Sequence, residues 1–405
     1  MAPFREPGLH EKVRIRKGMD IVHEEIFQAA LKSGHPFFGP TSVQEGIEGL
    51  NKKASAGYNW PGKKGELLSN NWPQFFESYV KFLHSSAEEC CENYNWAVIP
   101  KHEVLEAYKF FHKERIISIC PPELNLAAVI NLKNHFDTIN TNWHAQPLRQ
   151  GISAFNGQYE SLMKHHDSFE QHASLDVTAL ETSFSPWVHN LIAACECQYA
   201  DTPRQKEIIM KLAACHSEWL ACCYNGRSFK VRGHEPSGSS KTIHDNSKYV
   251  ASVVHGALWR LGKRRADYAL SVVGDDVFLS WNGKLDFDRL MKLIRETFAM
   301  KILARGTSVY GMPFLSRTIS RKRSGPISVN PQKMITNLHY KGKTPLEQGE
   351  IVSNLMVELA NNDKEKYLLR NYADYLDNFY HVNVRQPSPT LVASLFRPGV
   401  TPCSG

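Results

Sequence analysis

The sequence predicts an α+β fold, in which amphipathic helices alternate with short β-hairpins. Residues 271–280, SVVGDDVFLS, are rich in β-branched and aromatic residues on both sides of Gly274, which indicates two strands joined by a tight turn. From Lys241 onward, apolar residues recur every three or four positions, which predicts a long helix. Thr344 and Glu347 form a capping box ahead of a further apolar stripe, which predicts another helix start.

The remaining elements follow from apolar spacing and from proline and glycine breaks. Helical patterns cover residues 71–115, 187–223, 286–300 and a last region that begins at Thr344. Strands are expected over 115–120 and 172–177 and in a hairpin over 310–320, a loop over 225–240, and an extended tail after Val384.

Composition places the chain among soluble globular proteins. Its 405 residues suffice for a large core and for two or three domains, and 42% hydrophobic with 22% charged residues excludes a disordered chain. The formal net charge of +7 is compatible with a polyanionic partner, and equally with a mildly basic protein that binds none. Because no signal-peptide core or membrane span is evident, we expect a cytosolic chain, with peripheral membrane association left open.

The nine cysteines form no secreted-type framework, and their odd number favours reduced intracellular thiols. Several potential metal ligands gather in one stretch: Cys195, Cys197, Cys215, His216, Cys222 and Cys223. Their spacing matches no standard zinc finger or ribbon. Buried free thiols are therefore the main interpretation, and a structural zinc site is the alternative.

Two adjacent carboxylates, Asp275 and Asp276, follow the glycine at the tip of the expected hairpin. Like charges repel there and resist removal from water, so we expect a positive partner, for which a divalent metal ion is the simplest candidate. The alternative is an exposed turn with solvated acids. A third carboxylate, Asp176, ends an earlier strand in LDVTALE, with Glu181 five residues further on.

A third element, SGSSKTIHDN, lies between these two. Ser237 and Gly238 form a flexible loop ahead of the helix that begins near Lys241, where backbone N–H groups point outward. Thr242 and Asn246 then share one helix face at positions i and i+4. A hydroxyl and a carboxamide side by side suit a polyhydroxylated ligand such as ribose; the alternative is that both are ordinary polar surface residues.

In order and content, the three elements resemble motifs A, B and C of the RNA-dependent RNA polymerases of positive-strand RNA viruses, in the picornavirus-like supergroup. Three further segments are similar to family motifs: SAGYNWPG at 55–62 to motif G, KERIIS at 113–118 to motif F, and FLSR at 314–317 to motif E. The resemblance covers roughly residues 40–320, and motifs B and C are its most specific parts.

The resemblance implies a right-hand fold, with fingers, a palm built on a small antiparallel sheet backed by helices, and a short helical thumb. The implied boundaries are fingers at 1–170, palm with motif A at 171–187, a fingers insertion at 188–230, palm with motifs B to E at 231–318, and thumb and C-terminal tail at 319–405. A small thumb leaves an open channel, which would suit initiation on an oligonucleotide or protein-linked primer.

The resemblance also implies RNA-templated RNA synthesis, in which a primer 3′-hydroxyl attacks the α-phosphate of an NTP and expels pyrophosphate. Asp176 and Asp275 would bridge two Mg²⁺ ions, with Asp276 supporting one of them, and Mn²⁺ could substitute. Either Lys301 or Arg305 would protonate the leaving pyrophosphate, and arginine is the poorer proton donor.

The other implied contacts concern the nucleotide and the RNA. Glu181, where many family members have Asp, and Asn246 would read the ribose 2′-hydroxyl. The remaining candidates are Ser237, Gly238 and Thr242 at the nucleotide, Lys113 and Arg115 at its triphosphate, Ser55, Gly57, Lys52 and Lys53 at the template, and Leu315 and Arg317 at the primer.

The implied partners are template and product RNA and NTP substrates, with a protein primer or other viral replication proteins as further candidates. The implied location is the cytoplasm of an infected host cell, with replication membranes as a peripheral site. Two alternatives stay open. One is a palm-type reverse transcriptase, a class that generally lacks the Ser-Gly-x3-Thr-x3-Asn loop, and the other is a non-catalytic RNA-binding scaffold.

Overall fold

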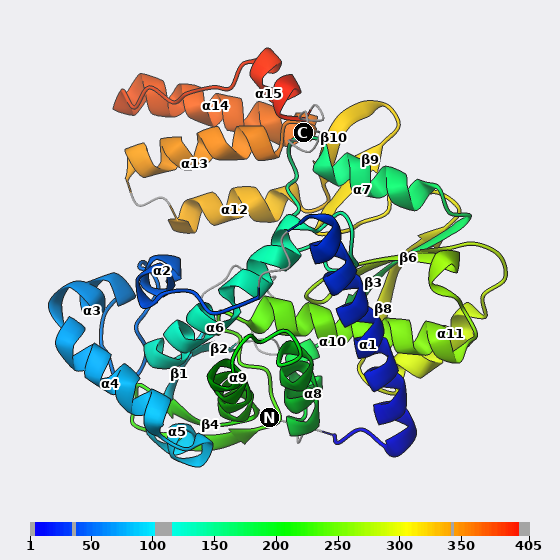
Figure 1. The fold of residues 1–405 in the computed structure, drawn as a ribbon. Helices are drawn as coiled ribbons and strands as arrows, with labels where there is room; N and C mark the ends of the chain where they lie inside the picture. Colours follow the sequence, from blue (N-terminus) through cyan, green and yellow to red (C-terminus); the bar gives the residue numbers. More distant parts are fainter. Residues whose placement is uncertain (1–4, 35–37, 102–115, 342–343, 397–405) are drawn as a thin grey trace.

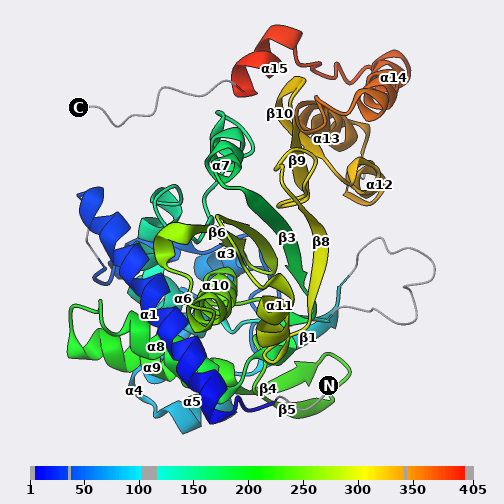
Figure 2. The same ribbon diagram turned by 90° about the vertical axis from the view of Figure 1, so that its right-hand side faces the viewer.

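The computed structural model describes residues 5–34, 38–101, 116–341 and 344–396 (Figure 1). A four-stranded antiparallel sheet of order β6-β7-β3-β8 forms its central layer. The strands are β3 (Gln171–Val177), β6 (Tyr268–Val273), β7 (Asp276–Trp281) and β8 (Met300–Gly306). Helices α10 (Thr242–Arg260) and α11 (Phe287–Arg295) back this sheet, and α1 (Leu9–Lys32) packs on α10 (Figure 2).

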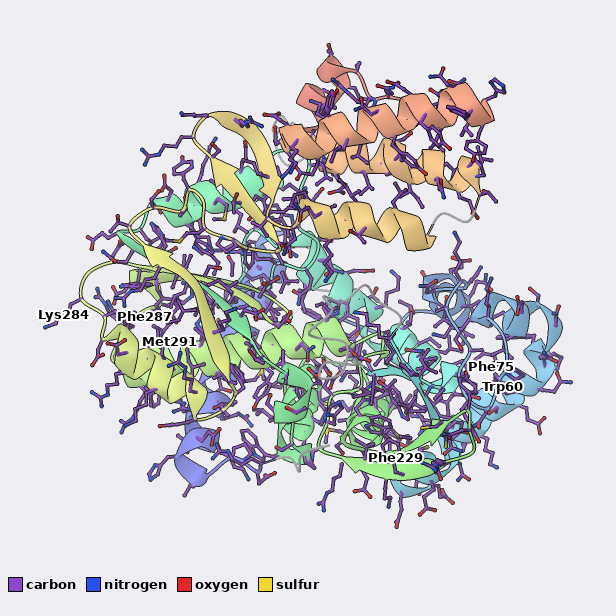
Figure 3. The ribbon with its side chains drawn as sticks, turned by 180° about the vertical axis from the view of Figure 1, so that it is seen from behind. Trp60, Phe75, Phe229, Lys284, Phe287 and Met291 are labelled. Atoms are coloured by element: carbon purple, nitrogen blue, oxygen red, sulfur yellow. The ribbon has the colours of Figure 1, made fainter. Side chains whose placement is uncertain are left out.

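Successive side chains of a strand point to opposite faces of the sheet, and those on one face form the core between the central sheet and its helices. Ala173, Leu175 and Val177 of β3 are at most 3% exposed and belong to the same apolar cluster as α10 and α11. Phe287 and Met291 of α11 join the cluster from the helix side (Figure 3). The intervening residues of β3, among them the one that carries the expected catalytic carboxylate, therefore project from the opposite face.

Helix α1 approaches α10 so closely that glycine is required on both sides. A Cβ on Gly18 would lie 1.8 Å from the carbonyl oxygen of Ser252, and a Cβ on Gly256 would lie 2.2 Å from the carbonyl oxygen of Arg14. Any side chain at either position would separate the helices. The N-terminal helix thus supports α10 directly from behind.

A second sheet, of order β2-β1-β4-β5, joins two parts of the chain that are far apart in sequence. Its strands are β1 (Trp96–Pro100), β2 (Ile116–Ile119), β4 (Glu218–Cys223) and β5 (Ser228–Arg232). The surrounding helices are α2 (Val43–Gly49), α3 (Lys64–Asn70), α4 (Trp72–His84), α5 (Ala87–Asn93), α6 (Pro122–Thr141), α8 (Pro186–Glu196) and α9 (Pro203–Ser217). Aromatic residues such as Trp60 and Phe75, whose ring centroids lie 6.1 Å apart, fill the core of this lobe (Figure 3).

Four strands occupy segments for which the sequence predicts another state. The helical predictions are wrong at β1, β4 and the start of β8, because α11 ends at Arg295, and the loop prediction over 225–240 is wrong at β5. Residues 102–115 of the first helical prediction lie outside the described residues. For β1, β4 and β8 the physical reason is pairing with distant segments, for example of β1 with β4 in parallel, where Trp96 faces Ala221. β5 forms because it pairs with the adjacent β4. The strands predicted over 115–120 and 172–177 and the hairpin at Gly274 are confirmed.

Part of the opposite face of the central sheet is covered by α7 (Gln158–Asp167) and β9 (Arg317–Ser320), which share an apolar cluster with Phe278 of β7, and β10 (Arg323–Ser328) pairs with β9. The predicted hairpin in this region is confirmed as a tight turn. The N–H of Phe314 donates to the carbonyl oxygen of Arg317 at 2.8 Å, and the N–H of Arg317 donates back at 3.0 Å.

A separate layer of helices forms the C-terminal part: α12 (Pro331–Lys341), α13 (Pro345–Glu358), α14 (Asp363–Tyr380) and α15 (Pro389–Phe396) (Figure 1). The capping box at the start of α13 is confirmed, because the N–H of Glu347 donates to Thr344 Oγ1 at 3.3 Å and the N–H of Thr344 donates to Glu347 Oε2 at 3.0 Å. The extended tail after Val384 is wrong at α15, whose Phe396 packs against the Phe155 ring. None of the helices in the described ranges has the length and apolarity needed to span a membrane.

Candidate active site

The β6–β7 hairpin presents the two adjacent aspartates at one end of the strands of the central sheet. Gly274 adopts φ +61°, a left-handed conformation that favours glycine, and its N–H donates to Ser247 Oγ of α10 at 2.7 Å. Val273 and Asp276 close the turn as register partners. Asp275 is exposed and Asp276 is half-buried, so the turn is fixed to the helix behind it while its carboxylates stay at the surface.

Asp176 comes to the same place from the adjoining strand. It is the register partner of Asp276 across the β3–β7 pair, and the N–H of Val177 donates to the carbonyl oxygen of Asp275 at 3.0 Å. Burial, followed by the charges of Asp275 and Asp176, raises the pKa of Asp276 to about 7. Three carboxylates that are distant in sequence therefore share one electrostatic environment.

This donor set fits a divalent metal ion in its chemistry. Carboxylate oxygens are the ligands that hard cations such as Mg²⁺ prefer, and a cation would relieve the repulsion that raises the pKa of Asp276. Across the described ranges, no three His, Cys, Asp or Glu side chains already surround a common point as metal ligands. The backbone thus brings Asp176 to Asp275 and Asp276, whose carboxylates would hold such an ion.

The segment that precedes α10 packs against strand β2. The N–H of Ser118 donates to Ser237 Oγ at 3.1 Å, and a Cβ on Gly238 would lie only 1.9 Å from the carbonyl oxygen of Ser118. The prediction of a flexible loop is therefore wrong, because Gly238 serves close packing on β2.

Thr242 and Asn246 lie in the first turns of α10, as the sequence predicts. The hydroxyl of Thr242 donates to the carbonyl oxygen of Pro236 at 2.6 Å, so its proton closes the loop and only its oxygen can accept a further bond. Asn246 is half-buried, and its Oδ1 accepts no hydrogen bond from a donor among the described residues. An unpaired buried carboxamide oxygen of this kind is suited to a ligand hydroxyl.

Glu181 lies exposed in a short 3₁₀ turn, Leu180–Ser183, directly after β3. Ala179, just before it, adopts φ +52°, a strained conformation for a residue with a side chain. The carbonyl oxygen of Glu181 accepts the N–H of Glu235 at 3.0 Å. This bond ties the turn after β3 to the loop before α10.

The structure separates the two candidate proton donors on β8. Lys301 is the register partner of Asp176, and cross-strand partners project from the same face of a sheet. Arg305 is the partner of Ala173 beyond a β-bulge, and its guanidinium carbon lies 4.3 Å from the ring centroid of Phe287. Lys301 therefore shares the face of the carboxylates, and Arg305 is directed toward α11.

Leu315 and Ser316 form the tip of the tight turn before β9, with φ values of +52° and +58°. Tyr159 of α7 donates its hydroxyl proton to the carbonyl oxygens of Phe314 and Arg317, at 2.8 and 2.7 Å. The Arg317 guanidinium pairs with Glu358 of α13. This ion pair connects the turn to the C-terminal helices.

Near the N-terminal helices, Ser55 forms an isolated antiparallel bridge with Lys63. Gly57 adopts φ +101° and its N–H donates to Ser55 Oγ at 3.2 Å, which shapes a compact loop with exposed Lys52 and Lys53 beside it. The expected triphosphate contacts Lys113 and Arg115 lie outside the described residues.

Sequence reasoning missed Tyr159 and a group of buried charges beneath α10, because neither has a local signal. The eight cysteines within the described ranges are free, and His216 uses both ring nitrogens, toward the Leu212 carbonyl oxygen and Ser239 Oγ, each at 2.7 Å. This histidine bonds to the loop before α10 two residues after Ser237, which β2 holds.

Three aspartates converge at one end of the central sheet, beside the Ser237-Gly238 loop and Lys301 of β8. This is the palm arrangement of a right-hand nucleic-acid polymerase. The chain belongs to the viral RNA-dependent RNA polymerase family, whose model matches residues 23–377. A solved structure described as Sicinivirus 3Dpol RNA dependent RNA polymerase is similar to it, with a TM-score of 0.76 and 13% identity over 96% of this chain and 84% of that chain. The search of curated proteins gave no match.

These findings define the class of protein. It is an RNA-directed RNA polymerase of α+β right-hand fold, with fingers, a palm that contains the central sheet, and a helical thumb. It carries out RNA-templated RNA synthesis for viral replication, acts on an RNA template and nucleotide substrates, and depends on divalent metal ions as its family does. The family membership decides against the reverse transcriptase and the non-catalytic scaffold.

Proposed function

We propose that the polymerase holds two Mg²⁺ ions with Asp176, Asp275 and Asp276, and that Mn²⁺ can replace them. The observation that supports this most strongly is the register pairing of Asp176 with Asp276, one residue from Asp275. When bound, the ions would stabilise negative charge on the attacking and leaving oxygens of nucleotidyl transfer. The aspartates orient the ions, and the hydrogen bond from Gly274 to Ser247 keeps their turn in place.

Lys301 is the proposed general acid for the pyrophosphate leaving group. Its proton would pass to the oxygen released from the α-phosphate, which is the atom where negative charge develops. The shared face with Asp176 supports this role. Arg305 instead lies on the Phe287 ring and would support the position of β8 on α11.

Asn246 and Glu181 are the proposed ribose readers. The unpaired Oδ1 of Asn246 would accept the hydrogen bond of the 2′-hydroxyl. The exposed carboxylate of Glu181 would contact the ribose from the turn after β3, which is bonded to the loop before α10. Ser237, Gly238 and Thr242 would hold the loop in place. Lys113 and Arg115 remain the proposed triphosphate contacts, because two cations match its charge.

RNA contacts are proposed at two places. Exposed Lys52 and Lys53, beside the compact loop at Ser55 and Gly57, would bind template phosphates. The turn at Leu315 and Arg317 would support the primer strand.

The domain boundaries proposed from the sequence are fingers at 1–170 and 188–230, palm at 171–187 and 231–318, and thumb at 319–405.

We also propose primer-dependent initiation, with a protein primer or other replication proteins as partners. The proposed location is the host cytoplasm, at or near replication membranes. Efficient initiation by the purified chain on an unprimed linear template would contradict the primer requirement.

The test of the proposed site is primer extension with NTPs and Mg²⁺, run beside an Asp275→Asn, Asp276→Asn variant. Loss of extension in a variant that stays folded supports the assignment, and equal extension by both proteins overturns it. Replacing Mg²⁺ by Mn²⁺ should retain extension, whereas Ca²⁺, which tolerates a looser coordination geometry, should not support it.

A further inference from the structure

A network of buried charges lies directly beneath the loop that precedes α10. The lysine and acid side chains of this network are at most 2% exposed: Glu196 of α8, Glu235 of the loop, and Lys241, Asp245 and Lys248 at the start of α10. Lys248 Nζ lies 2.5 Å from Glu196 Oε1, Lys241 Nζ lies 2.9 Å from Asp245 Oδ2, and Lys241 Nζ lies 3.6 Å from Glu196 Oε2. Glu196 therefore links two lysines of one helix.

The charges balance once one acid carries a proton. Burial, followed by the charge of Asp245, raises the pKa of Glu235 well above its usual range. Glu235 is then neutral, and its Oε2 lies 3.5 Å from His189 Nδ1 of α8. The two lysines are matched by Glu196 and Asp245, which is the condition under which a buried ionic group is tolerated.

The network anchors both ends of the loop. Glu235 precedes Pro236–Ser240 and Lys241 follows it, and both point into α8. In the middle, Ser239 Oγ bonds to His216 of α9, while Ser237 is held by β2 on the other side. Both ends and the middle of the loop are thus bonded to neighbouring elements. The charge network supplies the contacts at the two ends.

The network also sets the rotation of α10 about its axis. Lys241, Asp245 and Lys248 are spaced i, i+4 and i+7 and form one buried stripe. Asn246 follows Asp245 by one residue, which places it about 100° further round the helix. A rotation of α10 about its axis that moved the stripe away from Glu196 would rotate the Asn246 carboxamide by the same angle.

Stability alone does not account for this arrangement. Replacing a buried ion pair by apolar residues of similar volume is often neutral or stabilising, because desolvation offsets the attraction. The buried positions further along α10, such as Val250, Val253 and Val254, are apolar, so burial on this helix does not itself require charge. Ion pairs add a defined orientation of the helix, because each charged group must lie close to particular partner atoms.

We propose that Lys241 is a positioning residue for nucleotide selection, which through Glu196 and Asp245 fixes the loop and the rotation of α10 so that Asn246 reads the ribose. The inference rests on the proposed role of Asn246. Loss of the lysine charge lowers the discrimination between NTP and dNTP more than it lowers the rate of NTP incorporation, because the aspartates lie on other elements.

The experiment measures kcat and KM for single-nucleotide incorporation with an NTP and with the matching dNTP. Lys241→Met removes the charge and keeps the length of the side chain. We expect the NTP preference in kcat/KM to fall by about tenfold or more, since a misplacement of the order of 1 Å can cost up to ~100-fold. Glu196→Gln, which preserves shape, should shift the preference in the same direction and carries the test if Lys241→Met does not fold.

The matched control is Lys211→Met. Lys211 is also buried, and its Nζ donates to the carbonyl oxygens of Phe82 and Leu83, away from the loop. This variant should lose stability and keep the NTP preference. If Lys241→Met and Glu196→Gln keep the preference of the wild type, or change it no more than Lys211→Met does, the inference is overturned.

A further arm, Asn246→Ala, separates the two levels of the proposal. If Asn246→Ala lowers the NTP preference and Lys241→Met does not, the positioning role is wrong while the ribose-reading role stands. If Asn246→Ala leaves the preference unchanged, the ribose-reading assignment is wrong and the positioning role falls with it.

Discussion

Lys301 of β8 stands opposite Asp176 of β3, and the two side chains project from the same face of the central sheet. The β-bulge between these strands turns Arg305, four residues later, to the opposite face. A lysine and an arginine in one short strand therefore have different environments, which allows their roles to be separated by experiment.

The first prediction concerns these two residues. Lys301→Gln should lower kcat by about 10²-fold or more, the usual contribution of a general acid, with little change in KM for the NTP. Arg305→Gln removes only a contact with a ring and should retain most of the activity. Pre-steady-state incorporation rates measured from pH 6 to 9 decide the matter: if the arginine variant is the slower one, the assignment is reversed.

The second prediction concerns the like charges at the hairpin. Because the pKa of Asp276 is raised to about 7, its ionisation lowers the free energy of unfolding progressively from about pH 4 and fully above pH 7. At pH 8 in EDTA, Asp276→Asn should therefore have a higher Tm than the wild type although it is inactive. Added Mg²⁺ should raise the Tm of the wild type more than that of the variant.

Thermal unfolding by differential scanning fluorimetry measures both effects. The exposed Asp288→Asn on α11 is the control, and it should respond to Mg²⁺ as the wild type does. A variant at Asp276 that melts below the wild type in EDTA would contradict the prediction, because it would mean that the carboxylate stabilises the fold.

The third prediction tests the packing of the loop on β2. Gly238→Ala places a Cβ 1.9 Å from the Ser118 carbonyl oxygen, so the loop or the strand must move. We expect a loss of more than tenfold in kcat/KM for the NTP, since a shift of the order of 1 Å is costly in an active site. Gly8→Ala, where nothing lies within 4 Å of the added Cβ, should be close to neutral in the same assay.

The fourth prediction concerns Tyr159, which holds the turn between Phe314 and Arg317. Tyr159→Phe removes the hydroxyl that donates to both carbonyl oxygens, and this loss should lower stability by about 1 kcal/mol. The KM for primer-template should rise while single-turnover chemistry is retained. Tyr94→Phe removes a comparable bond to the Ser78 carbonyl oxygen in the other lobe, and should leave that KM unchanged.

The fifth prediction concerns acid. Burial lowers the pKa of histidines across the described residues, and most strongly that of the seven most deeply buried ones: His23, His135, His166, His189, His216, His244 and His255. They are neutral in the fold and become protonated on unfolding below pH 6.5, so stability is full above that pH and is lost as the pH falls. Each can cost up to about 1.4 kcal/mol between pH 7.5 and 5.5.

Carboxylates with raised pKa values, such as Asp276 and Asp245, act in the opposite direction over the same range. The histidines outnumber them, so denaturant unfolding should show a net loss of stability from pH 7.5 to 5.5. A free energy of unfolding that is constant or rises on acidification would contradict this.

Local signals in the sequence were sufficient for the parts of the site that are built from neighbouring residues. The turn at Gly274, the strand that ends near Asp176 and the capping box at Thr344 each depend on a few adjacent side chains. The strands β1, β4 and β8 depend on partners far away in the chain, and β5 pairs only with β4, so their local pattern was ambiguous with helix or loop.

The buried network under α10 shows the same limit at the level of single residues. Glu196 lies in a helix rich in alanine and cysteine, and nothing nearby indicates that it pairs with Lys241 and Lys248. A charged residue in a sequence is expected at the surface, and only the packing of α8 on α10 makes this one interior. The β-bulge that places Lys301 and Arg305 on different faces depends on the pairing of β8 with β3, so the local sequence does not predict it either.

The strand order of the central sheet has a consequence for how the protein is made. β3 lies between β7 and β8, and both of these neighbours follow it by the length of an entire small domain. During translation its apolar residues leave the ribosome long before either partner exists. The nascent polymerase must therefore shield an unpaired strand until Gly306 has been synthesised, which makes early pausing or truncation a direct route to aggregation.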